Sequence, residues 1–232
     1  MNKPILYSAL WAANPFSELF DKVVGVYDPS DLSELNSCLV VWGGEDICPK
    51  IYGQEVGSFC SVKSISERDA AEIALMFGAW ERSIPVIGVC RGAQLAVALA
   101  GGKLIQHVTG HGGHHSILDF NGNKLVTNSL HHQMMYPWNL NKDKYKLIAW
   151  AVPSRSDRYI WEDDDRPVIF EKEAIFDEPF RGNHILEPEI VFLPETKTLC
   201  IQGHPEFCSS GDPFLAYCNS LIKQHCLNHG ID

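Results

Sequence analysis

The stretch Ile-Pro-Val-Ile-Gly-Val-Cys-Arg-Gly-Ala-Gln-Leu-Ala-Val-Ala-Leu-Ala-Gly-Gly occupies residues 84–102 and predicts a strand, a sharp turn and a helix. The apolar run 84–89 is typical of a buried strand, with Pro85 near its start, where proline is tolerated. Residues 91–100 are rich in alanine and leucine and stop at two glycines, which is typical of a helix with a glycine C-cap. Cys90 therefore stands in the turn between the two elements.

Residues 88–92 have the form G-x-C-x-G, a thiol version of the nucleophile elbow G-x-S-x-G. In such a turn the nucleophile is lifted out of the sheet, and the two glycines let strand and helix approach closely. The N-terminus of the following helix favours a thiolate, and the backbone N–H of Arg91 is free to bind an oxyanion. The plainer alternative is a buried structural cysteine between two glycines.

A cysteine nucleophile needs a base, and the base needs an orienting group. His204 and Glu206 follow an apolar strand, and the two-residue period of a strand would place them on one face. Glu206 could then orient the imidazole of His204. The alternative is a strand-end histidine beside an ordinary surface carboxylate.

Short apolar runs alternate with helical patterns in the first half, which predicts a doubly wound α/β fold with a mostly parallel central sheet and helices on both faces. We expect one domain over residues 1–232, with the site at the carboxyl ends of the strands. The capping box 66–69 opens one helix, and Asp212-Pro213 opens another that ends near Gly230. The other predicted strands cover residues 4–10, 23–27, 38–42, 103–107, 124–128, 146–152, 167–176, 189–193 and 198–203, and residues 153–165 are predicted to be an exposed loop.

The composition excludes several classes of protein. Apolar residues make up 45% and charged residues 21%, which is ordinary for a globular chain. The 29 acidic residues against 19 basic ones give a formal net charge of −10, which disfavours nucleic acid and anionic membrane surfaces as partners. There is no long apolar segment or leader, and the eight cysteines form no C-x-x-C pair, so we expect a cytoplasmic protein with reduced thiols.

Four histidines lie close together in the sequence, at positions 107, 111, 114 and 115. Their spacing matches no common zinc motif, and glycines surround them. The sequence therefore favours a loop of satisfied or solvated histidines over a metal site. Neither a G-x-G-x-x-G motif nor a phosphate-binding loop is present, so no metal and no cofactor are expected.

Taken together, several segments give the chain a resemblance to class I glutamine amidotransferases. Within them it resembles the gamma-glutamyl-hydrolase-like cysteine peptidases, and most of all the gamma-glutamyl-gamma-aminobutyrate hydrolases. The segments occur in the family's order and span most of the chain: residues 43–49, Tyr52-Gly53, Arg68-Asp69 with Glu72, residues 85–94, Gly101-Gly102, residues 128–133 and residues 202–206.

The resemblance implies a flavodoxin-like sheet and a triad of Cys90, His204 and Glu206. It further implies an oxyanion hole built from the backbone N–H groups of Gly44 and Arg91. Gln94, one helical turn past the cysteine, matches a glutamine that helps to bind the glutamyl group. His132 and Gln133 lie in a segment that faces the α-amino and α-carboxylate groups of the substrate in the family, whereas Asp46 is expected to fix its own loop.

The expected reaction is release of glutamate from a gamma-glutamyl amide or glutamine through a gamma-glutamyl thioester. One alternative is a glutaminase subunit that supplies ammonia to a separate synthetase. A more remote one is a non-catalytic regulatory or binding protein on the same scaffold. The segments 107–128 and 153–188 depart from the family pattern, which leaves the leaving amine open.

Overall fold

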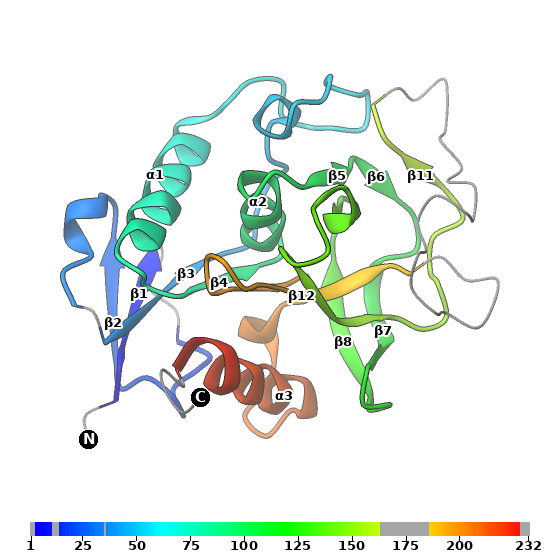
Figure 1. Ribbon diagram of the computed structural model, residues 1–232. Coiled ribbons are helices and arrows are strands. Elements are labelled where there is room, and N and C mark those ends of the chain that lie inside the picture. The colour runs from blue at the N-terminus through cyan, green and yellow to red at the C-terminus, as the bar shows by residue number, and fades with distance from the viewer. Residues whose placement is uncertain (1–2, 11–13, 35, 163–185, 228–232) are drawn as a thin grey trace.

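A nine-stranded sheet forms the centre of the molecule in the computed structural model, which describes residues 3–10, 14–34, 36–162 and 186–227 (Figure 1). In spatial order its strands are β2 (Lys22–Val26), β1 (Ile5–Ala9), β3 (Ser37–Val41), β4 (Val86–Val89), β13 (Thr198–Ile201), β12 (Pro188–Leu193), β10 (Lys146–Ala151), β7 (Gly112–Asp119) and β8 (Lys124–Leu130). Two small two-stranded sheets pair β5 (Lys103–Ile105) with β9 (Met134–Tyr136) and β6 (His107–Val108) with β11 (Tyr159–Ile160).

The sheet changes character across its width. The neighbours β2, β1, β3, β4 and β13 pair in parallel, which confirms the predicted parallel centre. From β13 onward, β12, β10, β7 and β8 pair antiparallel. The parallel part is the doubly wound unit predicted from the sequence, and the antiparallel part extends it.

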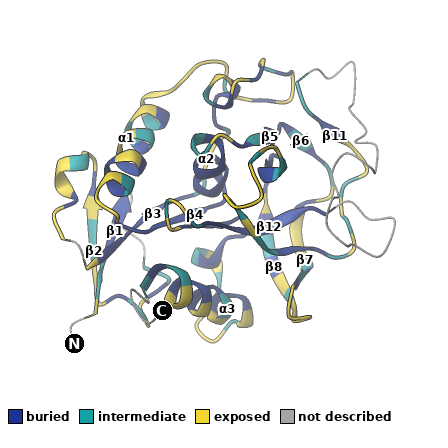
Figure 2. Ribbon diagram, viewed as in Figure 1, coloured by how far each residue is buried: buried dark blue, intermediate teal, exposed yellow. Residues whose placement is uncertain are grey.

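Helices cover both faces of the parallel part, as predicted. Figure 1 shows α1 (Glu67–Glu81) and α2 (Arg91–Leu99) on one side and α3 (Pro213–Ile222) on the other. Alternate strand residues feed the two cores: Leu39 and Val41 pack with α1 and α2, whereas Val40 packs with α3. The central strands and α2 are buried almost throughout, whereas α1 and α3 expose one face each (Figure 2).

The start of α1 is fixed as the sequence predicts. The Ser66 hydroxyl accepts a hydrogen bond from the backbone N–H of Asp69, and the Asp69 carboxylate accepts one from the N–H of Ser66. This capping box satisfies two N–H groups that would otherwise lack a partner at the helix end. It also buries the Asp69 carboxylate, which becomes important near Cys90.

Most predicted strands are found within two residues of their expected bounds, with some differences. The expected strand 103–107 is shorter, because β5 ends at Ile105. The predicted strand 167–176 lies outside the described residues. The predicted loop 153–165 is wrong in part: it contains the strand β11, whose Tyr159 and Ile160 are buried. The last helix continues from α3 through a π-helical turn, Lys223–Leu227, and the predicted end near Gly230 also lies outside the described residues.

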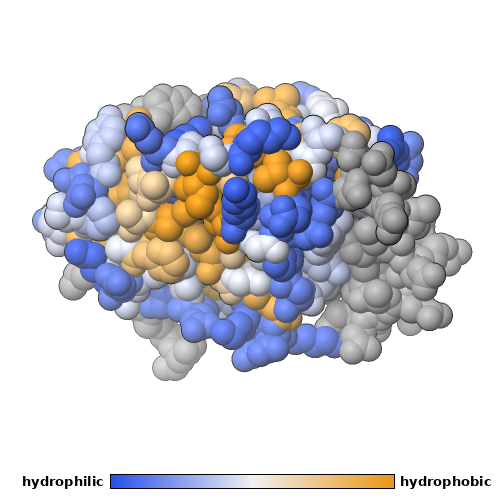
Figure 3. All heavy atoms as spheres, turned by 90° about the horizontal axis from the view of Figure 1, so that it is seen from above, coloured by the Kyte–Doolittle hydropathy of each residue, from blue (hydrophilic) through white to orange (hydrophobic). Residues whose placement is uncertain are grey.

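No helix within the described part of the chain is long and apolar enough to cross a membrane. On the face seen from above in Figure 3, apolar residues gather in one area that hydrophilic residues surround.

Candidate active site

Cys90 occupies a strained turn between β4 and α2. Its backbone φ of 49° and ψ of −107° lie in a region that residues with a side chain rarely adopt. The turn persists because its surroundings fix it: the N–H of Cys90 donates to the carbonyl oxygen of Ile201 at 2.7 Å. The Cys90 side chain is 6% exposed, at the carboxyl end of the central strand.

The two glycines of the G-x-C-x-G motif are required by close packing. A Cβ atom at Gly92 would overlap the carbonyl oxygen of Val41, and one at Gly88 would lie 2.7 Å from the backbone nitrogen of Ala93. These are backbone atoms that cannot move aside easily. The helix α2 can therefore sit on β3 and β4 only because both positions lack a side chain, as the sequence predicts.

His204 lies beside Cys90 and is paired with Glu206. The His204 Nδ1 and Glu206 Oε1 atoms are 2.8 Å apart, and both side chains are nearly buried. Burial alone would lower the pKa of His204, but its interactions with the Cys90 and Glu206 side chains raise that pKa to about 10. The imidazole is therefore held as a cation between a thiol and a carboxylate.

The route to the His204–Glu206 contact differs from the expected one. The strand β13 ends at Ile201, and residues Pro205–Phe207 form a 3-10 turn rather than continuing the strand. The turn, and not the alternation of a strand, brings the carboxylate back to the ring. The prediction that the strand continues through residues 204–206 is wrong, although the predicted contact between His204 and Glu206 is present.

Gly43 and Gly44 lie directly against this pair. A Cβ atom at Gly43 would lie 2.8 Å from Cε1 of His204 and 3.3 Å from Cβ of Cys90. The loop is held by Arg68, whose guanidinium donates to the Gly43 carbonyl oxygen at 2.8 Å. Gly44 has a backbone φ of 155°, a conformation that glycine adopts easily and residues with a side chain adopt rarely.

The Arg91 side chain anchors the turn to α1. It is 2% exposed and forms ion pairs with Asp69 and Glu72, two carboxylates that are fully buried. Glu72 also accepts a hydrogen bond from Arg68 at 2.9 Å. The charged side chains of Arg68, Glu72 and Arg91 therefore connect the Gly43 carbonyl to the start of α2. The backbone N–H of Arg91 is at the first position of α2, where no intrahelical acceptor exists.

The structure brings Gln94 and Gln133 together. The Gln94 amide donates to the backbone carbonyl oxygen of Gln133 at 2.9 Å and lies 3.4 Å from the Gln202 amide oxygen. The side-chain oxygen of Gln133 is buried and has no hydrogen-bond partner within the described part of the chain. An acceptor without a donor, next to the cysteine-bearing helix, is suited to bind an N–H group of a ligand.

His132 lies farther out than Gln133. Its Nε2 atom is 3.0 Å from the Asp46 carboxylate, which raises the pKa of His132 above its ordinary value. Asp46 also accepts two hydrogen bonds from Ser61, so it fixes its own loop as the sequence suggests. His132 remains 43% exposed and is the member of the predicted set that solvent reaches most easily.

Gln202 and Asn128 also contact the Cys90–His204 pair, although the sequence analysis predicts no role for either of them. The amide of Gln202 lies 3.8 Å from the Cys90 sulfur. The side chain of Asn128 holds the backbone of His204 on both sides, accepting from its N–H at 2.8 Å and donating to its carbonyl oxygen at 2.7 Å. Both residues belong to segments that carry the family resemblance, and that resemblance is the signal that could have identified them.

The histidines predicted to lie in a loop are placed differently. Residues 112–119 form the strand β7, so the expected loop is wrong there. His107 and His114 keep access to solvent, whereas His111 and His115 are buried. The buried pair contacts Glu189 on β12.

Replacing Glu206 with glutamine should lower the pKa of His204 by about 1–3, because the carboxylate that favours the imidazolium is lost. In the wild type the folded-state pKa lies above the ordinary value of 6.5. The stability that this ion pair contributes is therefore complete below about pH 6.5 and lost as the pH rises toward 10. Titration of the imidazole C–H resonances by NMR measures the pKa, and denaturant unfolding at several pH values measures the stability.

Glu195→Gln is the matched control, because this carboxylate is 71% exposed and pairs with Lys144 on the surface. The control should leave the His204 titration in place. An unchanged His204 titration in Glu206→Gln would show that the carboxylate does not hold the imidazole as a cation.

Known proteins resemble this chain in sequence and in fold. Residues 30–134 match the family model of Peptidase C26. The predicted resemblance to the class I glutamine amidotransferase-like family is confirmed at that level, and the likeness to one particular group of gamma-glutamyl hydrolases stays a prediction. A segment of 79 residues is 44% identical to "Putative glutamine amidotransferase Rv2859c" of Mycobacterium tuberculosis and covers 33% of this chain and 25% of that protein. Another of 92 residues is 38% identical to "Putative glutamine amidotransferase-like protein RP404" of Rickettsia prowazekii and covers 39% of this chain and 32% of that protein. The matches thus span about a quarter to a third of these curated relatives.

Solved structures of glutamine amidotransferases share the fold over nearly the whole chain. A glutamine amidotransferase of Thermotoga maritima aligns with a TM-score of 0.54 at 12% identity, covering 97% of this chain and 86% of that one. The glutaminase domain of Trypanosoma brucei CTPS, solved with bound acivicin, aligns with a TM-score of 0.53 at 14% identity, covering 99% and 96%. These likenesses confirm the predicted fold class.

Proposed function

We propose that this protein is a hydrolase that releases glutamate from a gamma-glutamyl amide through a thioester on Cys90. The observation that carries the proposal is the strained cysteine at the strand end beside a His204–Glu206 ion pair. A match with a peptidase family supports hydrolytic chemistry. The amidotransferase names of the relatives support a glutamine-like acyl group.

In the first half-reaction the Cys90 thiolate attacks the side-chain carbonyl carbon of the gamma-glutamyl amide. The backbone N–H groups of Gly44 and Arg91 hold the developing oxyanion. His204 donates a proton to the departing nitrogen as the C–N bond breaks, so a neutral amine leaves and a thioester remains.

In the second half-reaction a water molecule attacks the thioester carbonyl carbon and gives a proton to His204. The carbon–sulfur bond breaks, glutamate leaves, and the thiolate and imidazolium are restored. Glu206 holds the ring by its Nδ1 atom in both halves, which leaves Nε2 for proton exchange.

The glutamyl group would be recognised by Gln94, His132 and Gln133. The side-chain oxygen of Gln133, which has no hydrogen-bond partner among the described residues, can accept from the α-amino group. The exposed His132, whose pKa Asp46 raises, can attract the α-carboxylate when its ring is protonated. Gln94 holds the Gln133 backbone in place.

Ammonia supply to a separate synthetase is the second candidate. The fold likeness to the T. brucei glutaminase domain favours it, because that domain is named for hydrolysis of glutamine. The two candidates share the same chemistry and differ in the leaving group. They also differ in whether a partner chain receives the ammonia.

Glutamate release by the purified chain tests both candidates. Glutamine and a panel of gamma-glutamyl amines are assayed separately, with Cys90→Ala as the blank. Release from gamma-glutamyl amines with little from glutamine would support the free-standing hydrolase. Release from glutamine alone would support the ammonia-supplying role. No release above the blank from any substrate would count against both candidates.

A further inference from the structure

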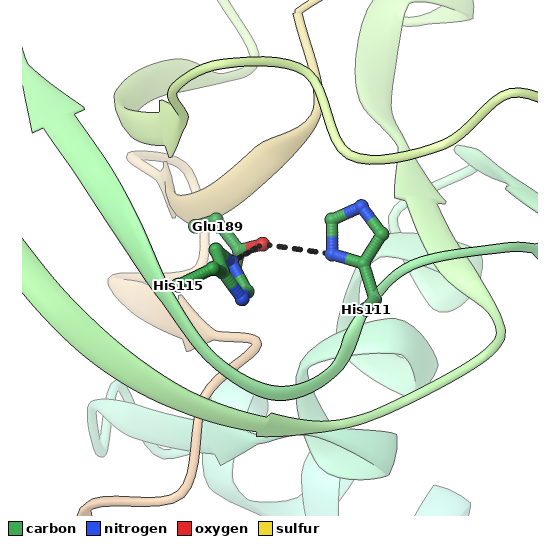
Figure 4. Close-up of side chains that lie close together, drawn as sticks. All are labelled: His111, His115 and Glu189. Carbon is green, nitrogen blue, oxygen red and sulfur yellow. Dashed lines mark hydrogen bonds and ion pairs between the residues drawn. The ribbon is translucent and has the colours of Figure 1, made fainter.

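A second cluster of chemically active side chains lies on the antiparallel side of the sheet. His111 precedes β7 and His115 lies on it, His131 follows β8, and Glu189 lies on β12. In Figure 4, dashed lines join the Glu189 carboxylate to the rings of His111 and His115. All four side chains are at most 1% exposed.

One oxygen atom of the Glu189 carboxylate lies close to a ring nitrogen of each of the three histidines. From Glu189 Oε1 the distances are 2.8 Å to His115 Nε2, 3.3 Å to His111 Nδ1 and 3.7 Å to His131 Nε2. In a tetrahedral zinc site with bonds of about 2.0–2.1 Å, neighbouring ligand atoms are about 3.3 Å apart. The three distances fall on both sides of that value. The ligand atoms of His111, His115 and Glu189 all lie within 4.8 Å of one another, whereas His131 lies outside this group and would have to move inward to bind the same ion.

Several of the converging atoms have no hydrogen-bond partner within the described part of the chain. They are His111 Nδ1, His131 Nε2 and Glu189 Oε2, and all are buried. Buried polar atoms without partners are costly and rare in folded proteins. A bound cation would satisfy the two ring nitrogens, and coordination by both carboxylate oxygens would satisfy Glu189 Oε2 as well.

The outer ring nitrogens of two histidines are already fixed by acceptors. His111 Nε2 lies 3.1 Å from the Glu187 carboxylate, and His131 Nδ1 lies 2.8 Å from the Gln133 carbonyl oxygen. Metal-binding histidines almost always make such a contact through the second nitrogen, which turns the ring and directs the free lone pair at the ion. Glu187 is itself held by Tyr159 and by two backbone N–H groups.

We propose that His111, His115, His131 and Glu189 bind a divalent transition-metal ion, with Zn²⁺ as the best fit. Three imidazoles and one carboxylate suit zinc, which prefers four nitrogen, sulfur or oxygen ligands. With His131 drawn in as the fourth ligand, no position is left open, so the ion would be structural. The site departs from the sequence-based expectation of no metal, because the spacing along the chain does not show that β12 supplies the carboxylate.

The ion would join three segments of the antiparallel side. It links β7, β12 and the segment that follows β8, where the carbonyl of Gln133 contacts both His131 and Gln94. Bound metal would therefore stabilise the fold beside the segment assigned to glutamyl recognition. The proposal itself does not depend on the proposed function, because metal binding is measured without turnover.

Zinc titration of the full chain, produced without a histidine tag and stripped with EDTA, tests the site. Competition with a chromophoric chelator gives the affinity, and elemental analysis after gel filtration gives the stoichiometry. We expect about one Zn²⁺ per wild-type chain and a rise in Tm when it binds. His111→Ala should lower the affinity at least tenfold. Glu187→Gln, which keeps the four ligands, should lower it by about 10–100-fold.

His114→Ala is the matched control, because this histidine lies on the same strand and is exposed. It should bind zinc as the wild type does. Circular dichroism confirms that each variant is folded, and Co²⁺ in place of Zn²⁺ reports the ligands by its visible absorption. Failure of the wild type to bind at micromolar Zn²⁺, equal loss in His114→Ala, or a cobalt spectrum typical of thiolate ligands would each overturn the proposal.

Discussion

Replacing Cys90 with alanine should lower glutamate release from the best gamma-glutamyl substrate by about 10⁴-fold or more. The variant lacks the only atom that could form the thioester in the proposed reaction. The strained turn should survive, because the Cys90 N–H bond to Ile201 and the glycine contacts of α2 do not involve the sulfur. Steady-state kinetics with coupled detection of glutamate gives the loss.

Replacing His204 with alanine should lower glutamate release by a similar factor. The losses in activity of the Cys90 and His204 variants should not add when the two changes are combined. His204→Ala removes the proton donor to the leaving amine, and residues that act as one unit show strongly non-additive losses. The double variant should therefore be about as slow as either single one. Cys226→Ala is the matched control, since this thiol is fully buried in the turn that packs on β13 and has no part in the proposed reaction. Multiplication of the two single losses would show that Cys90 and His204 act independently.

The parallel half of the fold and the turn at Cys90 could be predicted because their causes are local. Residues 84–102 have few other conformations open to them. The cysteine has a glycine near it on each side, an apolar run precedes it and an alanine-rich run follows it. The same holds for the capping box at Ser66, where two side chains and two N–H groups lie within one turn. Contacts of this kind can be predicted from the spacing of residues within a single segment.

The parts that could not be predicted depend on segments that are far apart in the chain. His111 and Glu189 are separated by 78 positions, and only the antiparallel pairing of β7, β10 and β12 brings them together. The approach of Glu206 to His204 required a 3-10 turn after β13, which begins at Pro205 and ends the extended conformation. Strand period alone could not indicate that change of direction.

Replacing Arg91 with alanine should destabilise the fold by about 3–5 kcal/mol. The guanidinium is buried and faces two buried carboxylates, Asp69 and Glu72, so its loss leaves both without their main counter-charge. Asp69 keeps its capping bond to Ser66 and Glu72 keeps Arg68, which places the expected effect toward the lower end of that range. Denaturant unfolding at neutral pH measures the loss as a shift of the midpoint.

Two further variants separate the buried charges from the size of the side chain. Arg82→Ala removes an arginine whose guanidinium, among the described residues, donates to the Gly78 carbonyl at the end of α1, and it should cost about 1 kcal/mol or less. Combining Arg91→Met with Asp69→Asn and Glu72→Gln removes the charges together and should recover much of the stability lost in Arg91→Ala. If Arg91→Ala cost no more than Arg82→Ala, the ion pairs would contribute little, and the turn at Cys90 would be held by the close packing at Gly88 and Gly92 and by the Cys90–Ile201 hydrogen bond.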